Sequence, residues 1–271
     1  MHNFNYDVIK VSGVDATNFL QSIITNDINM THNNTSIYAF ILSPQGRYLF
    51  DIFISMYDGA YYIEILENNT TKLLATLKMY KLRKNVNFEH LHNLTVLHSN
   101  NIISSSINIP ISYPDPRYSK LKFRTIVDKL DASYNAGAYD GLKTYIIDKY
   151  LYAIPDGEVD LIHGASAVME YGCAELNAIC YTKGCYVGQE VLARVRTYGA
   201  TRKKIFKIIS KSQLTPGSIV VDNLKIGRIC SVCENIGIAL VNSELLEQYR
   251  HMLDNDMSLR FDTPVWRNKN H

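Results

Sequence analysis

The sequence predicts an α+β fold whose carboxy-terminal part is built from strands. Hydrophobic residues make up 46% of the 271 residues and charged residues 20%, as in ordinary globular proteins. Up to about residue 200, segments with helical spacing of apolar residues are interspersed with segments that alternate like strands. Beyond that point, short apolar runs separated by turn residues dominate.

The first half of the chain mixes helices and strands. Asp15 can cap a helix that runs to about Ile24, where Thr25-Asn26-Asp27 ends it. Ser43–Gly46 contains the Pro and Gly of a tight connection, which predicts a hairpin. The elements expected here are strands over 38–42, 48–56, 61–66 and 86–97, and a helix over 71–82.

The second half begins with a proline-rich turn at 112–117, followed by a strand over 123–127 and a helix over 133–150. Short strands are expected over 204–209, 218–221, 225–232 and 237–241. We therefore predict a core over 1–200, made of two interleaved α+β lobes that divide near residue 100. A small β-barrel follows over 201–271.

Composition limits the setting in which the protein works. The net charge of +2 gives no global field that attracts polyanions. Five cysteines form an odd set in a chain large enough to fold without disulfides, which indicates a reducing compartment. Residues 1–7 lack the basic start and apolar core of a signal peptide, and no apolar run approaches the ~18 residues of a membrane span. We expect a cytoplasmic monomer with no membrane partner.

The segment Lys183–Glu190 carries the strongest chemical signal. Two glycines bracket Cys185 beside a lysine, and glycines permit a positive φ or a close approach of backbone to a ligand. A neighbouring ammonium would lower the pKa of the thiol and make the thiolate more available. Gln189 and Glu190 can open a helix that runs to Val195. On spacing alone, a buried cysteine in a tight turn before a helix is the alternative.

Together with Ala193-Arg194, this segment resembles the signature of the YgfZ-type folate-binding proteins, which are relatives of the glycine-cleavage T-protein. Other segments resemble the same family, namely 15–27, 43–47, Asp115-Pro116-Arg117 with Arg124, and 154–157. The resemblance implies a multi-lobed T-protein-like fold around a central cleft that accepts tetrahydrofolate or a derivative. It also implies an accessory role in assembling or repairing iron–sulfur enzymes, with indirect support of tRNA modification.

The resemblance also implies site residues. It aligns Glu170 with a carboxylate that faces the pterin, and a carboxylate can accept two N–H donors from a pterin edge. Arginine and lysine suit the anionic glutamyl tail. Relatives carry Pro-His-Glu where this sequence has Val168-Met169-Glu170, and glycine in place of Lys122. The further cofactor-binding residues that we expect are Asn26, Asp27, Arg117, Tyr186, Gln189 and Arg194.

A folate-dependent aminomethyltransferase, or another one-carbon transferase, is the alternative on the same fold. The T-protein positions the reacting folate nitrogen with an aspartate, and the corresponding stretch here, 67–74, contains none. We therefore favour a non-enzymatic factor. In it Cys185, with Lys183 beside it, engages a cluster, a sulfur carrier or a client thiol. One thiolate does not hold a cluster alone, so a bridging or redox role is expected.

Other candidate sites are interpreted as structural. Cys230 and Cys233 lie in a predicted strand, where positions three apart face opposite sides, and His90 and His92 lack a third ligand nearby. We therefore predict no metal site. The basic residues between 194 and 204 have a single aromatic neighbour, whereas RNA recognition uses interleaved aromatics, so direct nucleic-acid binding is not expected. The expected partners are iron–sulfur client enzymes or assembly factors.

Overall fold

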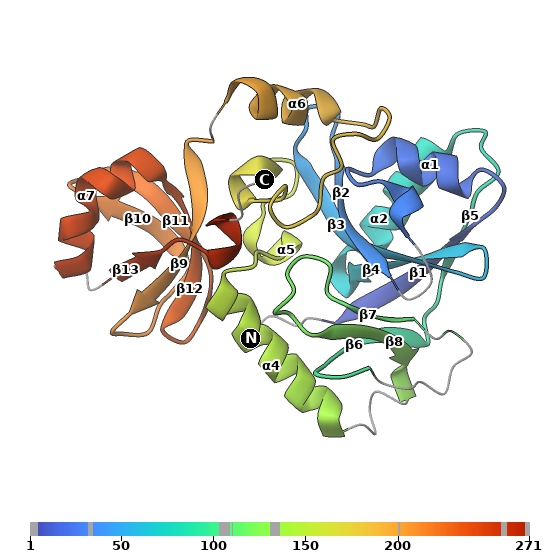
Figure 1. The fold of residues 1–271 in the computed structure, drawn as a ribbon, viewed down its shortest axis with the longest axis horizontal. Coiled ribbons are helices and arrows are strands. Elements are labelled where there is room, and N and C mark those ends of the chain that lie inside the picture. Colours follow the sequence, from blue (N-terminus) through green and yellow to red (C-terminus); the bar gives the residue numbers. More distant parts are fainter. Residues whose placement is uncertain are drawn as a thin grey trace.

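The computed structural model describes residues 5–31, 35–102, 109, 111–130, 136–199, 201–255 and 259–268. Within these residues, three antiparallel sheets form the framework of the fold (Figure 1). Helices α1 and α2 cover the first sheet, α4 (Ala136–Tyr152) packs on the second, and α7 (Ser243–Asn255) packs on the third. The predicted helix from residue 133 begins outside the described residues, which resume at Ala136.

The first sheet has the strand order β2-β3-β4-β1-β5. Helix α1 (Ala16–Ile23) buries Phe19, Leu20 and Ile23 on one face, because these residues recur at helical spacing. Helix α2 (Thr70–Lys81) buries Leu73 and Leu77 against the same face of the sheet. The strands are β1 (Tyr6–Ser12), β2 (Ser36–Leu42), β3 (Tyr48–Tyr57), β4 (Ala60–Leu66) and β5 (Asn87–His90), with short 3-10 helices η1 (Ile28–Met30) and η2 (Glu67–Asn69).

The second sheet corrects the sequence prediction of one strand over 86–97. The chain turns after β5, where the backbone N–H of Leu94 donates to the carbonyl of Leu91 at 2.9 Å. It then enters β6 (Leu94–Ser99), which pairs in a different sheet of order β6-β8-β7. Apolar alternation continues through both strands, so no break is visible in the pattern. The remaining strands are β7 (Ser112–Pro114) and β8 (Phe123–Asp128).

The third sheet has the order β10-β11-β12-β9-β13 and confirms the strands predicted after residue 200. Sequence analysis assigned no element to α7 or to β13 (Leu259–Asp262). The N-cap of α7 is Asn242, whose side-chain oxygen accepts from the backbone N–H groups of Glu244 and Leu245. The other strands are β9 (Lys203–Ser210), β10 (Gly217–Val221), β11 (Leu224–Cys233) and β12 (Ile236–Asn242).

One hydrophobic core joins the three sheets, with Phe53, Tyr113 and Ile238 among its members. Between α4 and the third sheet the chain forms α5 (Gly157–Asp160), η3 (Val168–Tyr171) and α6 (Gln189–Tyr198). The last helix, η4 (Val265–Asn268), brings Trp266 into this core, where its indole N–H donates to the carbonyl of Tyr152 at 2.8 Å. Among the helices of the described residues, none has the length and apolarity needed to span a bilayer.

Candidate functional site

The loop over 183–188 is anchored to the end of helix α1. The ammonium of Lys183 donates to the carbonyls of Ile24 and Asn26, both at 2.7 Å. The backbone N–H of Val187 donates to the carbonyl of Ser22 at 3.2 Å. Two motifs that are far apart in the sequence therefore form one unit. We refer to residues 183–188 as the cysteine loop.

Asn26 and Asp27 hold this unit together from the side of η1. The side-chain amide of Asn26 is buried and donates to the carbonyls of Tyr38 and Asn177, at 2.9 and 2.8 Å. The Asp27 carboxylate accepts from the backbone N–H of Asn29 and from the side chain of Gln21. Asn26 and Asp27 were expected as cofactor ligands. In the structure these side-chain atoms form hydrogen bonds to other residues of the protein.

The glycine that ends the cysteine loop explains its contact with the first hairpin. Gly188 has a φ of +84°, and a Cβ atom there would lie 2.6 Å from the carbonyl oxygen of Ser43. Glycine is required because the two backbones meet without room for a side chain. Helix α6 begins at the next residue, and the side-chain oxygen of Gln189 accepts from the backbone N–H of Tyr186 at 3.2 Å.

Cys185 is exposed, whereas the lysine two positions before it is partly buried. Burial lowers the pKa of Lys183 to about 8, and its ammonium lies 5.0 Å from the ring centre of Tyr186. The contacts of Lys183 fix the loop to α1 and leave the thiol of Cys185 at the surface. A direct partnership between this ammonium and the thiol stays a prediction.

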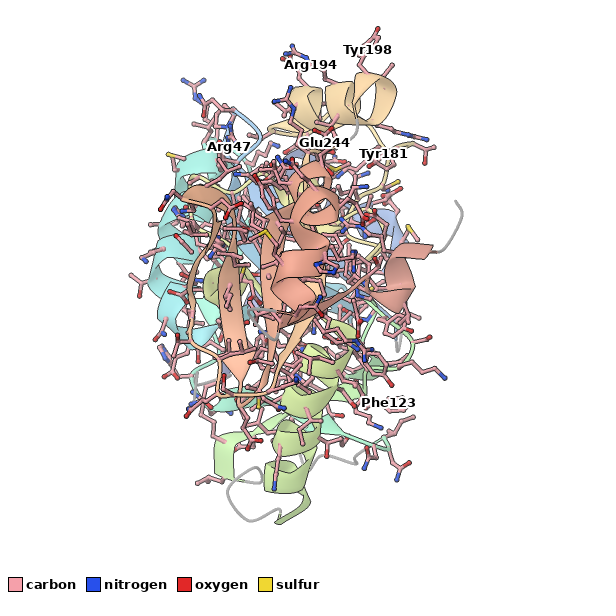
Figure 2. All side chains as sticks on the ribbon, turned by 90° about the vertical axis from the view of Figure 1, so that its left-hand side faces the viewer. Arg47, Phe123, Tyr181, Arg194, Tyr198 and Glu244 are labelled. Atoms are coloured by element: carbon pink, nitrogen blue, oxygen red, sulfur yellow. The ribbon has the colours of Figure 1, made fainter. Side chains whose placement is uncertain are left out.

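Helix α6 carries the predicted residue Arg194 on its exposed side. Leu192 is its buried residue, and Tyr198 is 86% exposed. Figure 2 shows Arg194 and Tyr198 pointing away from the rest of the molecule. Arg194, which was expected as a cofactor ligand, therefore lies at the surface and not in a buried pocket.

Glu170 lines a cleft of about 330 Å³ between η3 and the third sheet. Burial raises the pKa of this carboxyl group, against the opposing charges of Lys203 and Arg47. We call this space the Glu170 cleft. The charged residues that line it are Glu170, Lys203, Lys225 and Arg228.

A second cleft, of about 690 Å³, lies on the other side of η3 and includes Met169. The guanidinium of Arg196 covers the ring of Tyr181 at 4.1 Å from its centre, and the Tyr181 hydroxyl lies 3.8 Å from the sulfur of Met169. Lys204 and Arg267 supply further positive charge. Sequence reasoning missed this Tyr181 cleft, although an aromatic residue two positions before Lys183 was visible. Figure 2 places Tyr181 and Arg47 on opposite sides of the molecule.

Arg117 does not reach either cleft, which departs from its expected role as a cofactor ligand. It is 1% exposed, and its guanidinium donates to both oxygens of Asp115, to Asp156 at 2.6 Å and to the hydroxyl of Tyr145 at 2.7 Å. Arg124 is buried beside it against Glu64 at 2.8 Å. These arginines neutralise buried carboxylates, so their chemistry is structural.

The histidine pair on β5 and in the turn after it, His90 and His92, lies beside a single carboxylate. His90 lies 3.1 Å from the carboxylate of Asp7, and its ring packs on His92. Across the part of the chain that the structure describes, no three His, Cys, Asp or Glu side chains group as metal ligands.

The comparisons identify the fold. The chain is similar to the crystal structure of the glycine cleavage system aminomethyltransferase T from Bartonella henselae, with a TM-score of 0.70 and 13% identity. The match covers 88% of this chain and 76% of that one. Residues 202–269 match the family model described as CAF17, C-terminal beta-barrel domain. The predicted fold class, a T-protein-like α+β core with a carboxy-terminal β-barrel, is confirmed. The division near residues 100 and 200 stays a prediction.

Curated relatives are named iron-sulfur cluster assembly factor IBA57. The Neurospora crassa homolog is 31% identical over 74% of this chain, but the chain spans only about half (51%) of its length. The mouse protein is 28% identical over 95% of this chain and 81% of its own length, and the human protein is 27% identical over 96% and 82%.

These three relatives are named as mitochondrial. The expectation of a cytoplasmic protein is therefore wrong. It rested on the composition of the chain and on the pattern of residues 1–7, and neither of these decides between reducing compartments.

Proposed function

We propose that this chain is an accessory factor of iron–sulfur cluster assembly that presents Cys185 to a partner protein. The observation that carries the proposal is an exposed cysteine on a loop that is fixed at both ends. The names of the relatives and the resemblance of Lys183–Glu190 to the YgfZ signature support it. Tetrahydrofolate, or a derivative, is the proposed ligand of the Glu170 cleft.

The thiol of Cys185 is suited to bind a cluster together with ligands from a partner protein. Clusters are held by several ligands, so a partner must supply the others, and a cysteine at the surface can be reached by that partner. The exposed side of α6, with Arg194 and Tyr198, adjoins the cysteine loop and extends the surface that a partner would cover. Iron–sulfur enzymes that modify tRNA are among the clients that such a factor would serve.

The Glu170 cleft suits a pterin with an anionic tail. The half-buried carboxylate is an acceptor for the N–H groups of the pterin edge, and Lys203 and Lys225 can meet the glutamyl carboxylates. An accessory role is preferred over one-carbon transfer because the stretch 67–74 offers no aspartate. Its one acidic residue, Glu67, lies at the surface near the side chain of Asn5.

Complementation tests the proposed function directly. The chain, directed to the compartment of the relative that it replaces, is expected to restore the activity of iron–sulfur-dependent enzymes in cells that lack their IBA57-type factor. Enzyme activity in extracts is the measurement, with equal amounts of soluble protein verified by immunoblot. No restoration by soluble protein would contradict the proposal.

Glu170→Gln is expected to weaken tetrahydrofolate binding about 10- to 100-fold, because hydrogen bonds to a charged group contribute about 1.5–3 kcal/mol. Isothermal titration calorimetry measures the affinity. Glu158→Gln, an exposed carboxylate on α5, is the matched control and should bind as wild type. If Tyr181→Ala removes binding while Glu170→Gln retains it, the ligand lies in the Tyr181 cleft and the assignment fails.

A further inference from the structure

A basic surface with exposed apolar side chains lies where helix α2 ends. We call it the α2-end surface and define it by Val14, Lys78, Met79, Lys81, Leu82, Arg83 and Lys84. Val14, Met79 and Leu82 are 84%, 62% and 85% exposed. Large apolar side chains exposed together, beside a run of cations, mark an interaction surface more than single exposed residues do.

Two turns bring these residues to one end of the first sheet. The backbone N–H of Asn85 donates to the carboxylate of Asp15 at 2.7 Å, and the N–H of Asp15 donates to the carbonyl of Asn85 at 3.3 Å. A Cβ atom on Gly13 would lie 2.3 Å from that carbonyl oxygen, so the turns are in close contact. Helices α1 and α2 lie on the side of the molecule opposite the third sheet (Figure 1).

The charge of the surface is positive. Within the described residues, Lys78, Lys81 and Arg83 form no ion pair, and Lys84 reaches the hydroxyl of Ser22 at 3.4 Å. The acidic residue of the neighbouring turn, Asp15, is occupied by the backbone of Asn85. Lys78, Lys81 and Arg83 therefore remain available to an anionic partner, whereas Lys84 is held against helix α1.

The backbone of Leu82 adds an independent observation. Its φ of +50° and ψ of −118° lie in a region that L-amino acids rarely adopt and that glycine tolerates. An exposed leucine in this conformation costs stability and gains no buried contact. Backbone strain of this kind clusters at functional sites, where a side chain is kept for binding and not for stability.

We propose that the α2-end surface docks on an anionic phospholipid membrane. Leu82, Met79 and Val14 would enter the boundary between headgroups and acyl chains. Lys78, Lys81 and Arg83 would meet the lipid phosphates. Three of the four cations are lysines, which are depleted at protein–protein interfaces, so a lipid surface fits better than an acidic protein. The expected absence of a membrane partner rested on the lack of a signal-peptide pattern and of a spanning apolar run, and neither bears on a surface that docks on a bilayer.

Docking at this surface would hold the cysteine loop near the membrane. Ser22 contacts both regions, because its hydroxyl meets the ammonium of Lys84 and its carbonyl accepts from the backbone N–H of Val187. Helix α1 thus separates the α2-end surface from the cysteine loop. The inference does not depend on what Cys185 binds.

Vesicle flotation tests the proposal. Wild type is expected to float with vesicles of phosphatidylcholine and phosphatidylglycerol and to remain behind with phosphatidylcholine alone. The double variant Lys78→Gln, Lys81→Gln should bind on the order of 30-fold more weakly. Each cation near an anionic bilayer strengthens binding about 5-fold, and the variant removes two of them. The matched control is Lys143→Gln, Leu151→Ser on the exposed side of α4, which should float as wild type.

Leu82→Gly separates docking from folding. It should raise the midpoint of thermal unfolding, because glycine relieves the strained backbone, and yet weaken flotation, because the apolar side chain is lost. Wild-type protein that fails to float with anionic vesicles overturns the proposal. So does flotation of the Lys78, Lys81 and Leu82 variants at the wild-type level.

Discussion

Arg117→Ala will lower the free energy of unfolding by about 3–5 kcal/mol, because it leaves buried carboxylates without their counter-charge. The guanidinium holds both Asp115 and Asp156, and all three side chains are at most 1% exposed. Native domains are stable by only ~5–15 kcal/mol, so this change removes a large part of the total. Urea denaturation followed by circular dichroism measures it.

The contacts around Arg117 explain the size of the effect. Asp156 also forms an ion pair with the buried ammonium of Lys149 at 3.3 Å. The same ammonium lies 3.1 Å from the carboxylate of Asp160. The hydroxyl of Ser231 on β11 donates to Asp160, so the network reaches from the second sheet to the third. Removal of one cation therefore disturbs charges on several elements at once.

Lys122→Ala is the matched control for a cation in an ion pair. Its ammonium lies 3.9 Å from Asp148 and is partly exposed, so the change should cost less than about 1 kcal/mol. Arg117→Lys should recover little stability, because an ammonium does not reproduce the forked contacts of a guanidinium. An Arg117→Ala protein that unfolds at the urea concentration of wild type would refute the structural role.

Local signals in the sequence account for the elements that were predicted correctly. Helix α1 and the hairpin of β2 and β3 follow from apolar spacing, a polar stop at Thr25–Asp27, and the Pro and Gly of the turn. Strands β5 and β6 were merged, because the turn between them contains neither glycine nor proline and apolar residues continue across it. The pairing partners that separate these strands lie far away in the sequence.

The candidate site was predicted only in part, because some of its contacts join residues that are far apart in the sequence. The meeting of residues 24–27 with the cysteine loop agrees with the motifs that the sequence singled out. Arg117 was expected to contact a ligand, since the sequence does not reveal whether an arginine faces an anion in solution or a buried aspartate. The Tyr181 cleft depends on Arg196, which is fifteen residues away on α6 and whose contact with the Tyr181 ring is not visible from the sequence.

Cys185→Ser is expected to reduce the activity of iron–sulfur client enzymes to that of cells without the factor. A serine hydroxyl does not replace a thiolate, because soft sulfur ligands favour iron–sulfur clusters. The side chain is exposed, so the midpoint of thermal unfolding should not change. Client enzyme activity in the complemented cells, together with thermal unfolding of the purified variant, measures both effects.

Cys180→Ser is the matched control, because it lies five residues before Cys185 in the same segment and is only partly exposed. Its sulfur lies 3.4 Å from the hydroxyl of Thr182, a contact that serine can keep. The variant should support client enzymes as wild type does. Equal loss in both variants would point to a disulfide between them, and full activity of Cys185→Ser would show that the thiol has no part in the function. If activity is lost in Cys185→Ser and kept in Cys180→Ser, the function depends on one exposed thiolate. A single thiolate does not hold a cluster alone, so the partner must supply the other ligands.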